Sequence, residues 1–361
     1  MLYIGTDEGI YRWFSGAGWP IFHGLQGRAI VGLASPGGGL LVALDSAAKV
    51  WESANNGIDW RSIPLPEGAG RPTSIALLDG SEVVVATARP LGLFRRAFGL
   101  PSGADAPRTL ARARGIEDRI IGGAMNLAAR VRGGTATATL ERPPTQSFGW
   151  TAMSVPSAGS DLLPTAVRLV TGHAGTAYAA VAGAGLWAST DLGASWSRLP
   201  GLPDEVHAVR FASGGKTIAV GTGDGVWISG DGGQTWADSS VGLEKVRQVR
   251  ALEIKPGDPK TLLAGCAPRG AGEGPVADRA GLRFALYESK DAGTTWKHVT
   301  RGFPEALESD SIVDIRVMPD DPACAAVALA SGEMWSTATN GLWWEPMARQ
   351  IRGARVLCAT P

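Results

Sequence analysis

The chain has 361 residues, 44% of them hydrophobic, and contains 50 glycines, 23 prolines and 13 tryptophans. This composition supplies a large apolar core and many tight turns, and it excludes a disordered chain. Lysine plus arginine and aspartate plus glutamate both total 34, so the zero formal net charge excludes a global attraction for nucleic acid or anionic membranes.

The N-terminus begins with a strand-like run, Leu2–Ile4, without a basic and apolar leader segment. No stretch of about 18 apolar residues follows, so we expect a cytoplasmic protein without membrane insertion. The odd number of cysteines, Cys266, Cys324 and Cys358, favours buried free thiols over a disulfide or a metal site. We expect no cofactor and no metal, and the sequence does not indicate the oligomeric state.

Aromatic residues recur along the chain on strand-like segments. Around each one, an apolar run, a turn, a second run, the aromatic strand and a tryptophan strand follow one another, which predicts a four-stranded unit. The clearest unit comprises Glu205–Ala212, Thr217–Gly221, Gly225–Ser229 and Thr235–Ser239. The aromatic anchors of the units are Tyr11, Trp51, Phe94, Trp187, Trp227, Tyr287 and Trp335.

The interval between Phe94 and Trp187 is 93 residues, about two repeat periods. A degenerate unit fits there, with Thr135–Leu140 as its third strand and Trp150 on its fourth. This interpretation favours eight units. The alternative is seven units with a long insertion between residues 100 and 150. Both interpretations predict a single domain over residues 1–361.

Three of the anchors are followed by a common pattern of serine, aspartate, glycine and tryptophan. Aspartate and serine side chains bond backbone groups in turns, glycine provides conformational freedom, and tryptophan buries a large surface. We therefore expect structural turns between third and fourth strands rather than catalytic acids. Weaker copies at residues 51–60 and 335–344 lose the aspartate. The full copies are Ser189, Asp191, Gly193 and Trp196; Ser229, Asp231, Gly233 and Trp236; and Ser289, Asp291, Gly293 and Trp296.

The pattern resembles the Asp-box, or BNR, repeat of sialidases, sortilin-type receptors, xyloglucanases and photosystem assembly-factor propellers. The resemblance implies an all-β fold, a closed β-propeller of four-stranded antiparallel blades. It covers essentially the whole chain but is weaker between residues 100 and 150. The opening unit lacks a first strand, and the run 353–359 reads as one. We expect this C-terminal strand to close the first blade, with Cys358 beside residues 2–19, because closure removes open sheet edges.

Arginine recurs on the first strands, which line the central channel in propellers. An arc of arginines there would bind an acidic peptide, a phosphate or a carboxylate group. The alternative is that each arginine pairs with a carboxylate such as Glu253 or Asp314, or fills the space between blades with its stem. The arginines of this predicted binding site are Arg168, Arg210, Arg250, Arg316 and Arg355.

Two further segments stand out from the repeats. Residues 89–142 contain ten arginines and four acidic residues, which indicates either a docking surface for an acidic partner or a degenerate blade with solvated arginines. The glycine-rich segment 267–281 reads as an inserted loop, a common place for binding residues. It lacks the lysine and hydroxyl residues of a phosphate-binding loop.

Sugar-hydrolysing propellers use a carboxylate pair, or a tyrosine nucleophile with an arginine cluster. The four tyrosines read as packing residues, only Trp13 and Trp343 fall outside repeat positions, and no catalytic residue is recognisable. A xyloglucanase-like cleft needs a second propeller, for which the chain is too short. We expect a non-enzymatic scaffold for protein interaction or assembly, with an acidic protein partner. The alternative is a sialidase-like or other glycoside hydrolase.

Overall fold

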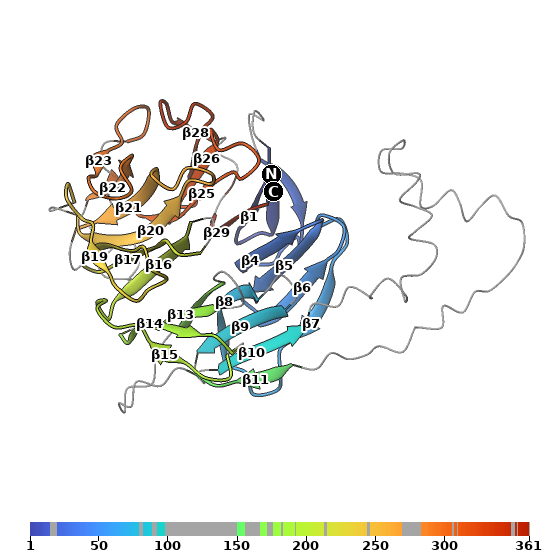
Figure 1. Ribbon diagram of the computed structural model, residues 1–361. Coiled ribbons are helices and arrows are strands. Elements are labelled where there is room, and N and C mark those ends of the chain that lie inside the picture. Colours follow the sequence, from blue (N-terminus) through green and yellow to red (C-terminus); the bar gives the residue numbers. More distant parts are fainter. Residues whose placement is uncertain are drawn as a thin grey trace, which may run out of the picture. The chain divides into compact units, whose positions relative to one another are not determined.

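Seven antiparallel β-sheets make up the part of the chain that the structure describes (Figure 1). Among the described residues there is no helix, and hence none that could cross a membrane. The computed structural model describes residues 1–14, 20–78, 82–88, 92–97, 150–155, 167–171, 176–181, 183–191, 193–212, 215–243, 246–268, 283–304, 307–308, 310–347, 351 and 353–360, with the backbone alone at 167–171, 283 and 308.

Four antiparallel strands form each sheet, in sequence order except that β29 is the first strand of blade 1, and we number the sheets as blades 1 to 7. From the innermost strand outward, blade 1 comprises β29 (Val356–Ala359), β1 (Leu2–Gly5), β2 (Ile10–Trp13) and β3 (Ile21–Gly24); blade 2 comprises β4 (Ile30–Gly37), β5 (Leu40–Asp45), β6 (Lys49–Ser53) and β7 (Arg61–Pro64); and blade 3 comprises β8 (Arg71–Leu78), β9 (Glu82–Ala88), β10 (Gly92–Ala97) and β11 (Thr151–Met153).

The other four sheets repeat this order, and one of them has an additional short strand. Blade 4 comprises β12 (Val167–Thr171), β13 (Ala177–Val181), β14 (Gly185–Ser189) and β15 (Ser197–Arg198); blade 5 comprises β16 (Val206–Phe211), β17 (Ile218–Thr222), β18 (Gly225–Ser229) and β19 (Ala237–Asp238); blade 6 comprises β20 (Gln248–Ile254), β21 (Leu262–Ala267), β22 (Arg283–Ser289) and β23 (Lys297–His298), with β24 (Leu307–Glu308) paired to β22; and blade 7 comprises β25 (Ile312–Val317), β26 (Ala325–Leu329), β27 (Met334–Thr337) and β28 (Glu345–Pro346).

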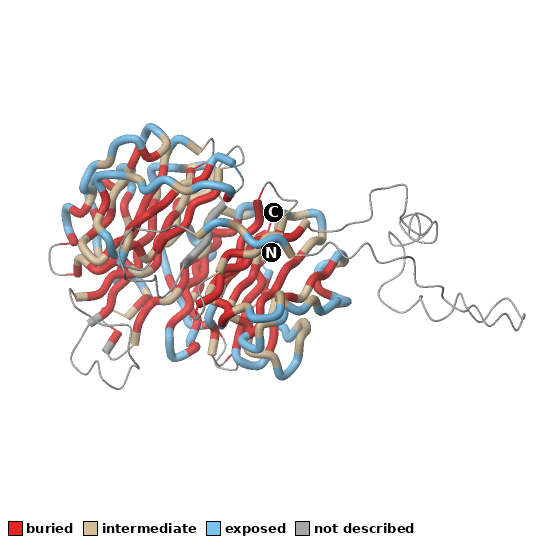
Figure 2. Tube along the Cα trace, turned by 90° about the horizontal axis from the view of Figure 1, so that it is seen from below, coloured by how far each residue is buried: buried red, intermediate tan, exposed pale blue. Residues whose placement is uncertain are grey.

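Neighbouring blades contact one another all the way around a ring. Strand β29 contacts β4 and β25, and the circuit between them runs through β8, β12, β13, β16 and β20. The second strands β13, β17, β21 and β26 are buried at every position, because a neighbouring blade covers each face. Figure 2 shows these buried runs in red and the exposed turns in pale blue. The fold is therefore a seven-bladed β-propeller.

The expected eighth blade is wrong. Strand β11 pairs with β10, with Met153 opposite Leu93, so Trp150 precedes the outer strand of blade 3 and belongs to no separate unit. The indole Nε1 of Trp150 donates to the carbonyl oxygen of Pro64 in blade 2 at 2.8 Å. The long segment after Ala97 thus connects the third and fourth strands of one blade. The predicted strand Thr135–Leu140 lies outside the described residues.

The prediction that the C-terminal strand completes blade 1 is confirmed. Strand β29 pairs antiparallel with β1, and Cys358 lies opposite Tyr3. Two backbone bonds extend this ladder at its ends, from Arg355 N to Gly5 O and from Thr360 N to Met1 O, both at 2.9 Å. The pairing gives β1 a neighbour on each side, so that blade 1 has four strands like the other blades.

Candidate functional site

The repeated turns lie between the third and fourth strands, as expected. In blade 6, Ser289 Oγ donates to Asp291 Oδ1 at 2.8 Å and accepts from Gly293 N at 2.9 Å. The same carboxylate accepts from Thr295 N at 2.8 Å and from Thr295 Oγ1 at 2.6 Å. Blades 4 and 5 repeat these bonds around Asp191 and Asp231. The aspartate oxygens are thus occupied within each turn.

These bonds favour the ionised carboxylates, although the side chains are exposed. The hydroxyl and amide of Thr295, followed by the hydroxyl of Ser289, lower the pKa of Asp291 to about 2. Ser195 and Ser189 lower the pKa of Asp191 to about 2 in the same way. Thr235 and Ser229 likewise lower the pKa of Asp231. A carboxyl group held ionised in this way organises a turn and is a poor proton donor near neutral pH.

The glycine and the tryptophan of each turn pack against the preceding blade. Gly293 has φ +85°, and a Cβ atom at this position would lie 2.3 Å from Ile228 Cδ1 of blade 5. Trp296 is 4% exposed, and its Nε1 donates to Ser239 O, also in blade 5, at 2.7 Å. Trp196 makes the corresponding bond to Ser154 O of blade 3 at 2.9 Å.

The weaker copies keep the turn geometry without the aspartate. In blade 2, Asn55 Oδ1 accepts from Asp59 N at 2.9 Å. In blade 7, Thr339 Oγ1 accepts from Trp343 N at 2.9 Å. A single acceptor oxygen at the aspartate position is therefore enough to form the turn.

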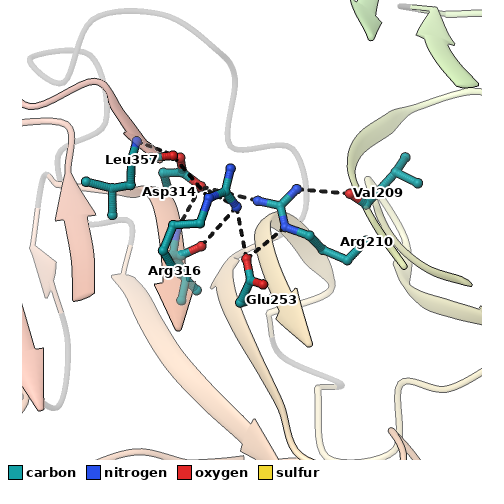
Figure 3. Close-up of polar contacts among 7 residues, drawn as sticks. Val209, Arg210, Glu253, Asp314, Arg316 and Leu357 are labelled. Atoms are coloured by element: carbon teal, nitrogen blue, oxygen red, sulfur yellow. Dashed lines mark hydrogen bonds and ion pairs between the residues drawn. The ribbon is translucent and has the colours of Figure 1, made fainter. Parts of the chain in front are cut away.

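The most connected group of charges lies on the innermost strands of blades 5, 6 and 7 (Figure 3). Glu253 Oε2, on β20, accepts from Arg210 Nε on β16 and from Arg316 Nη1 on β25, both at 2.9 Å. Asp314 Oδ1, also on β25, lies 3.3 Å from Arg210 Nη2 and from Arg316 Nη1. The four groups have a formal net charge of zero, and we call them the channel cluster.

Backbone groups complete the channel cluster and extend it to blade 1. Asp314 Oδ2 accepts from Leu357 N at 3.0 Å, and Arg316 Nε donates to Leu357 O at 3.1 Å. Arg210 Nη1 donates to Val209 O at 2.9 Å. The side chains are 11–24% exposed, so one network links four successive blades through groups with little contact with solvent.

The two guanidinium groups of the cluster have opposite pKa shifts. Burial, followed by the positive charge of Arg316, lowers the pKa of Arg210. Burial opposes the charge of Arg316 as well, but Asp314 and Glu253 outweigh it and raise the pKa of that group. Both groups remain cations near neutral pH, so the cluster stays a set of ion pairs.

The predicted arginines do not share one position on their strands. Arg210 and Arg316 each pair with a residue of the second strand. In both blades, that residue pairs in turn with the third-strand residue directly after the aromatic anchor. In blade 6 that position holds Glu253, not arginine. Arg168 is aligned instead with the residue before its anchor, and its side chain lies outside the described part of the structure. Arg250 falls at a register shift of β20 and is half-buried.

Arg355 lies outside the channel cluster. It precedes β29, and its Nη2 donates to Asp7 Oδ2 at 3.1 Å. Three of the five predicted arginines, Arg210, Arg316 and Arg355, are thus paired with carboxylates, two of them with the groups that the sequence offers as the alternative. An anion-binding role of all five arginines stays a prediction that these pairings do not favour.

The other predicted features contribute less to a site. Of the arginine-rich segment 89–142, the described Arg95 and Arg96 pair with Glu82 and Glu52, and most of the insertion 267–281 lies outside the described residues. The cysteines are free and buried, and burial raises the pKa of Cys358 to about 11. Within the described ranges, no three His, Cys, Asp or Glu side chains gather as metal ligands would.

No protein-family model matches the sequence, and no curated protein matches it. Solved structures match it in fold. A Niastella koreensis GH74 enzyme has a TM-score of 0.63 at 12% identity, with 95% of this chain and 51% of the enzyme covered. YCF48 bound to a D1 peptide has a TM-score of 0.54 at 12% identity, covering 93% and 87%. Virginiamycin B lyase from Staphylococcus aureus has a TM-score of 0.55 at 10% identity, covering 90% and 85%.

These similarities establish the β-propeller fold alone. The chain spans about half the length of the GH74 enzymes that it matches over more than nine-tenths of its own length, such as that of Xanthomonas campestris, of which it covers 47%.

Proposed function

We propose that this protein is a non-enzymatic scaffold that binds a protein partner, and that its repeats are those of the Asp-box, or BNR, propellers. The channel cluster carries the proposal. A glycosidase needs one carboxyl group to donate a proton and a second to act as nucleophile or base. Glu253 and Asp314, the inner-strand carboxylates of the cluster, both hold guanidinium groups instead.

The remaining repeated carboxylates also have structural partners. Asp191, Asp231 and Asp291 accept hydrogen bonds from two residues of their own turns. A propeller whose repeated acids are occupied in this way offers surfaces rather than reactive groups. The fold similarity to YCF48 bound to a D1 peptide supports a protein partner, because that propeller has a peptide ligand and is spanned over 87% of its length.

The alternative function is glycoside hydrolysis. The fold similarity to GH74 enzymes keeps it open, with the highest TM-score among the structures compared above. An acidic partner and a cytoplasmic location belong to the proposal as predictions from the sequence.

Two measurements separate the scaffold from the hydrolase. Affinity capture with the full chain from its source cells, quantified by mass spectrometry, should retain a partner protein in an amount comparable to the bait. The purified protein should not turn over sialosides or β-glucans. Turnover that Glu253→Gln abolishes, while the exposed control Glu333→Gln leaves it intact, would refute the scaffold and establish the enzyme.

A further inference from the structure

The turn of blade 7 differs from the turn of blade 6 at two neighbouring positions. Leu342 and Trp343 occupy the places that hold Thr294 and Thr295 in blade 6. They are 56% and 60% exposed. Trp343 therefore lacks the hydroxyl that bonds the aspartate position in blade 6, and more than half of its side chain is exposed.

A surface cleft of about 370 Å³ lies beside this turn. Leu342 and the adjoining Gly341 form one wall, and residues 297–301 of blade 6 form another. The indole of Trp343 lies next to the cleft: a Cβ atom on Gly302 would be 3.0 Å from Trp343 Cε2, and Trp344 N donates to Arg301 O at 3.0 Å. Leu342 thus lines the polar cleft, and the adjoining Trp343 lies outside the lining, against Gly302.

The charge available in the cleft is positive. Its lining carries three cations, Lys290, Lys297 and Arg301, against the two carboxylates of Glu288 and Asp291, and Lys290 pairs with Glu288 at 3.2 Å. Lys297 and Arg301 also line the cleft, are exposed, and have no ionic or hydrogen-bonded side-chain partner among the described residues. Two cations without a partner among the described side chains therefore stand beside the exposed Leu342 and Trp343.

We propose that this cleft binds an extended acidic segment of a partner protein. An apolar side chain of that segment packs on Leu342 and Trp343, and its carboxylates pair with Lys297 and Arg301. The inference rests on the scaffold function proposed above and specifies the surface and the chemistry of its partner. A neutral sugar would stack on the indole but leave both cations without a counter-charge, which favours the acidic peptide.

The test uses the full chain and a fluorescein-labelled peptide with a central tryptophan flanked by two glutamates on each side. Fluorescence anisotropy should show saturable binding that weakens as salt rises. Trp343→Thr, which restores the residue of the blade 6 turn, should weaken binding about tenfold or more, because a buried aromatic side chain carries much of the affinity of such contacts. A peptide with glutamines in place of the glutamates should bind the unaltered chain no more tightly than the original peptide binds the Trp343→Thr chain.

Matched variants separate the cleft from the rest of the surface. Leu342→Ala and the pair Lys297→Gln with Arg301→Gln should weaken binding. Ile58→Ala, at the corresponding and 70% exposed position of the blade 2 turn, should leave it unchanged. Equal effects of Ile58→Ala and Leu342→Ala, or tighter binding of an oligogalacturonate than of the peptide, would overturn the proposal.

A further arm distinguishes the failure of this inference from that of the scaffold. The Trp343→Thr chain is used as bait in the affinity capture described above. If the partner is retained as by the unaltered chain, the cleft proposal is wrong and the scaffold stands. If the partner is lost while the melting temperature is unchanged, the cleft is the docking surface.

Discussion

The turns of blades 6 and 7 have the same backbone geometry and different exposed side chains. In blade 6 the outer positions hold Asp291 and Thr295, which bond each other. In blade 7 they hold Thr339 and Trp343, and the indole is left exposed. The two turns share the first hydroxyl, which accepts from the glycine amide, as well as the acceptor oxygen, the glycine and the inner tryptophan. The fold therefore fixes these shared positions and leaves the others available for binding.

The largest effect should come from the shared tryptophans. Trp296 is 4% exposed and Trp344 is 1% exposed, each within the core between two blades. Trp296→Ala and Trp344→Ala should each lower the free energy of unfolding by about 3–5 kcal/mol. Urea unfolding measures both. A loss below about 1 kcal/mol for Trp344→Ala would contradict the view that the two turns are fastened alike.

Alanine substitutions of the two shared glycines should lower the free energy of unfolding by different amounts. An alanine Cβ at position 293 would lie 2.3 Å from Ile228 Cδ1, whereas at position 341 its closest neighbour is Glu288 Oε1 at 3.4 Å. Both have positive φ, which costs an alanine about 1–2 kcal/mol. Gly293→Ala should therefore cost about 2–4 kcal/mol because overpacking adds to the strain, and Gly341→Ala only about 1–2 kcal/mol. Chemical denaturation that ranks them in reverse order would refute this account.

The aspartate turns should respond to acid, and the blade 7 turn should not. The folded state lowers the pKa of Asp291 from 3.8 to about 2. A lowered pKa stabilises the fold above pH 4, and that contribution is lost as the pH falls from about 4 to 2. A chain with threonine at positions 191, 231 and 291, as at 339, should show a flatter decline of melting temperature over this window. An unchanged decline would assign the acid sensitivity to other carboxylates.

The smallest effect on stability should come from Trp343→Thr. The indole is 60% exposed, so its removal should change the free energy of unfolding by about 0.5 kcal/mol or less in either direction. Thermal unfolding beside Trp344→Ala measures the contrast between the two adjacent tryptophans. A large loss of stability would mean that Trp343 is a packing residue and that the cleft has no aromatic side chain to offer a ligand.

The aromatic anchors and repeated turns were sufficient to predict the blades, because each blade reuses the same local chemistry. The blade count was harder. A tryptophan after a long irregular segment satisfies the repeat spacing whether that segment forms a blade or an inserted connection. Only the pairing of β11 with β10 shows that the strand after Trp150 completes blade 3 and does not belong to a further blade. Strand pairing across some fifty residues depends on tertiary contacts, which spacing does not report.

The charged residues of the channel cluster could be named from the sequence, but the alignment of their strands could not. The first strands of blades 5, 6 and 7 each contain a register shift, between Val206 and Ala208, Val249 and Ala251, and Ile312 and Asp314. A bulge adds a residue without advancing the pairing. In blade 6 the shift falls at Arg250 itself, and the connections between the strands of blades 4 and 7 differ in length, so counting from an arginine to its anchor aligns residues that the sheets place apart. Trp343, by contrast, could be recognised from the sequence as a tryptophan outside the repeat.

The pairing of β29 with β1 determines the order in which the molecule can be completed during translation. Cys358 lies opposite Tyr3, so blade 1 lacks its innermost strand until the six other blades have left the ribosome. At about 5–20 residues per second, this delay is roughly 20–70 s. Throughout that time β1 presents unpaired backbone groups that a neighbouring nascent chain could capture. Each newly made molecule is therefore open to aggregation through β1 until β29 has been synthesised.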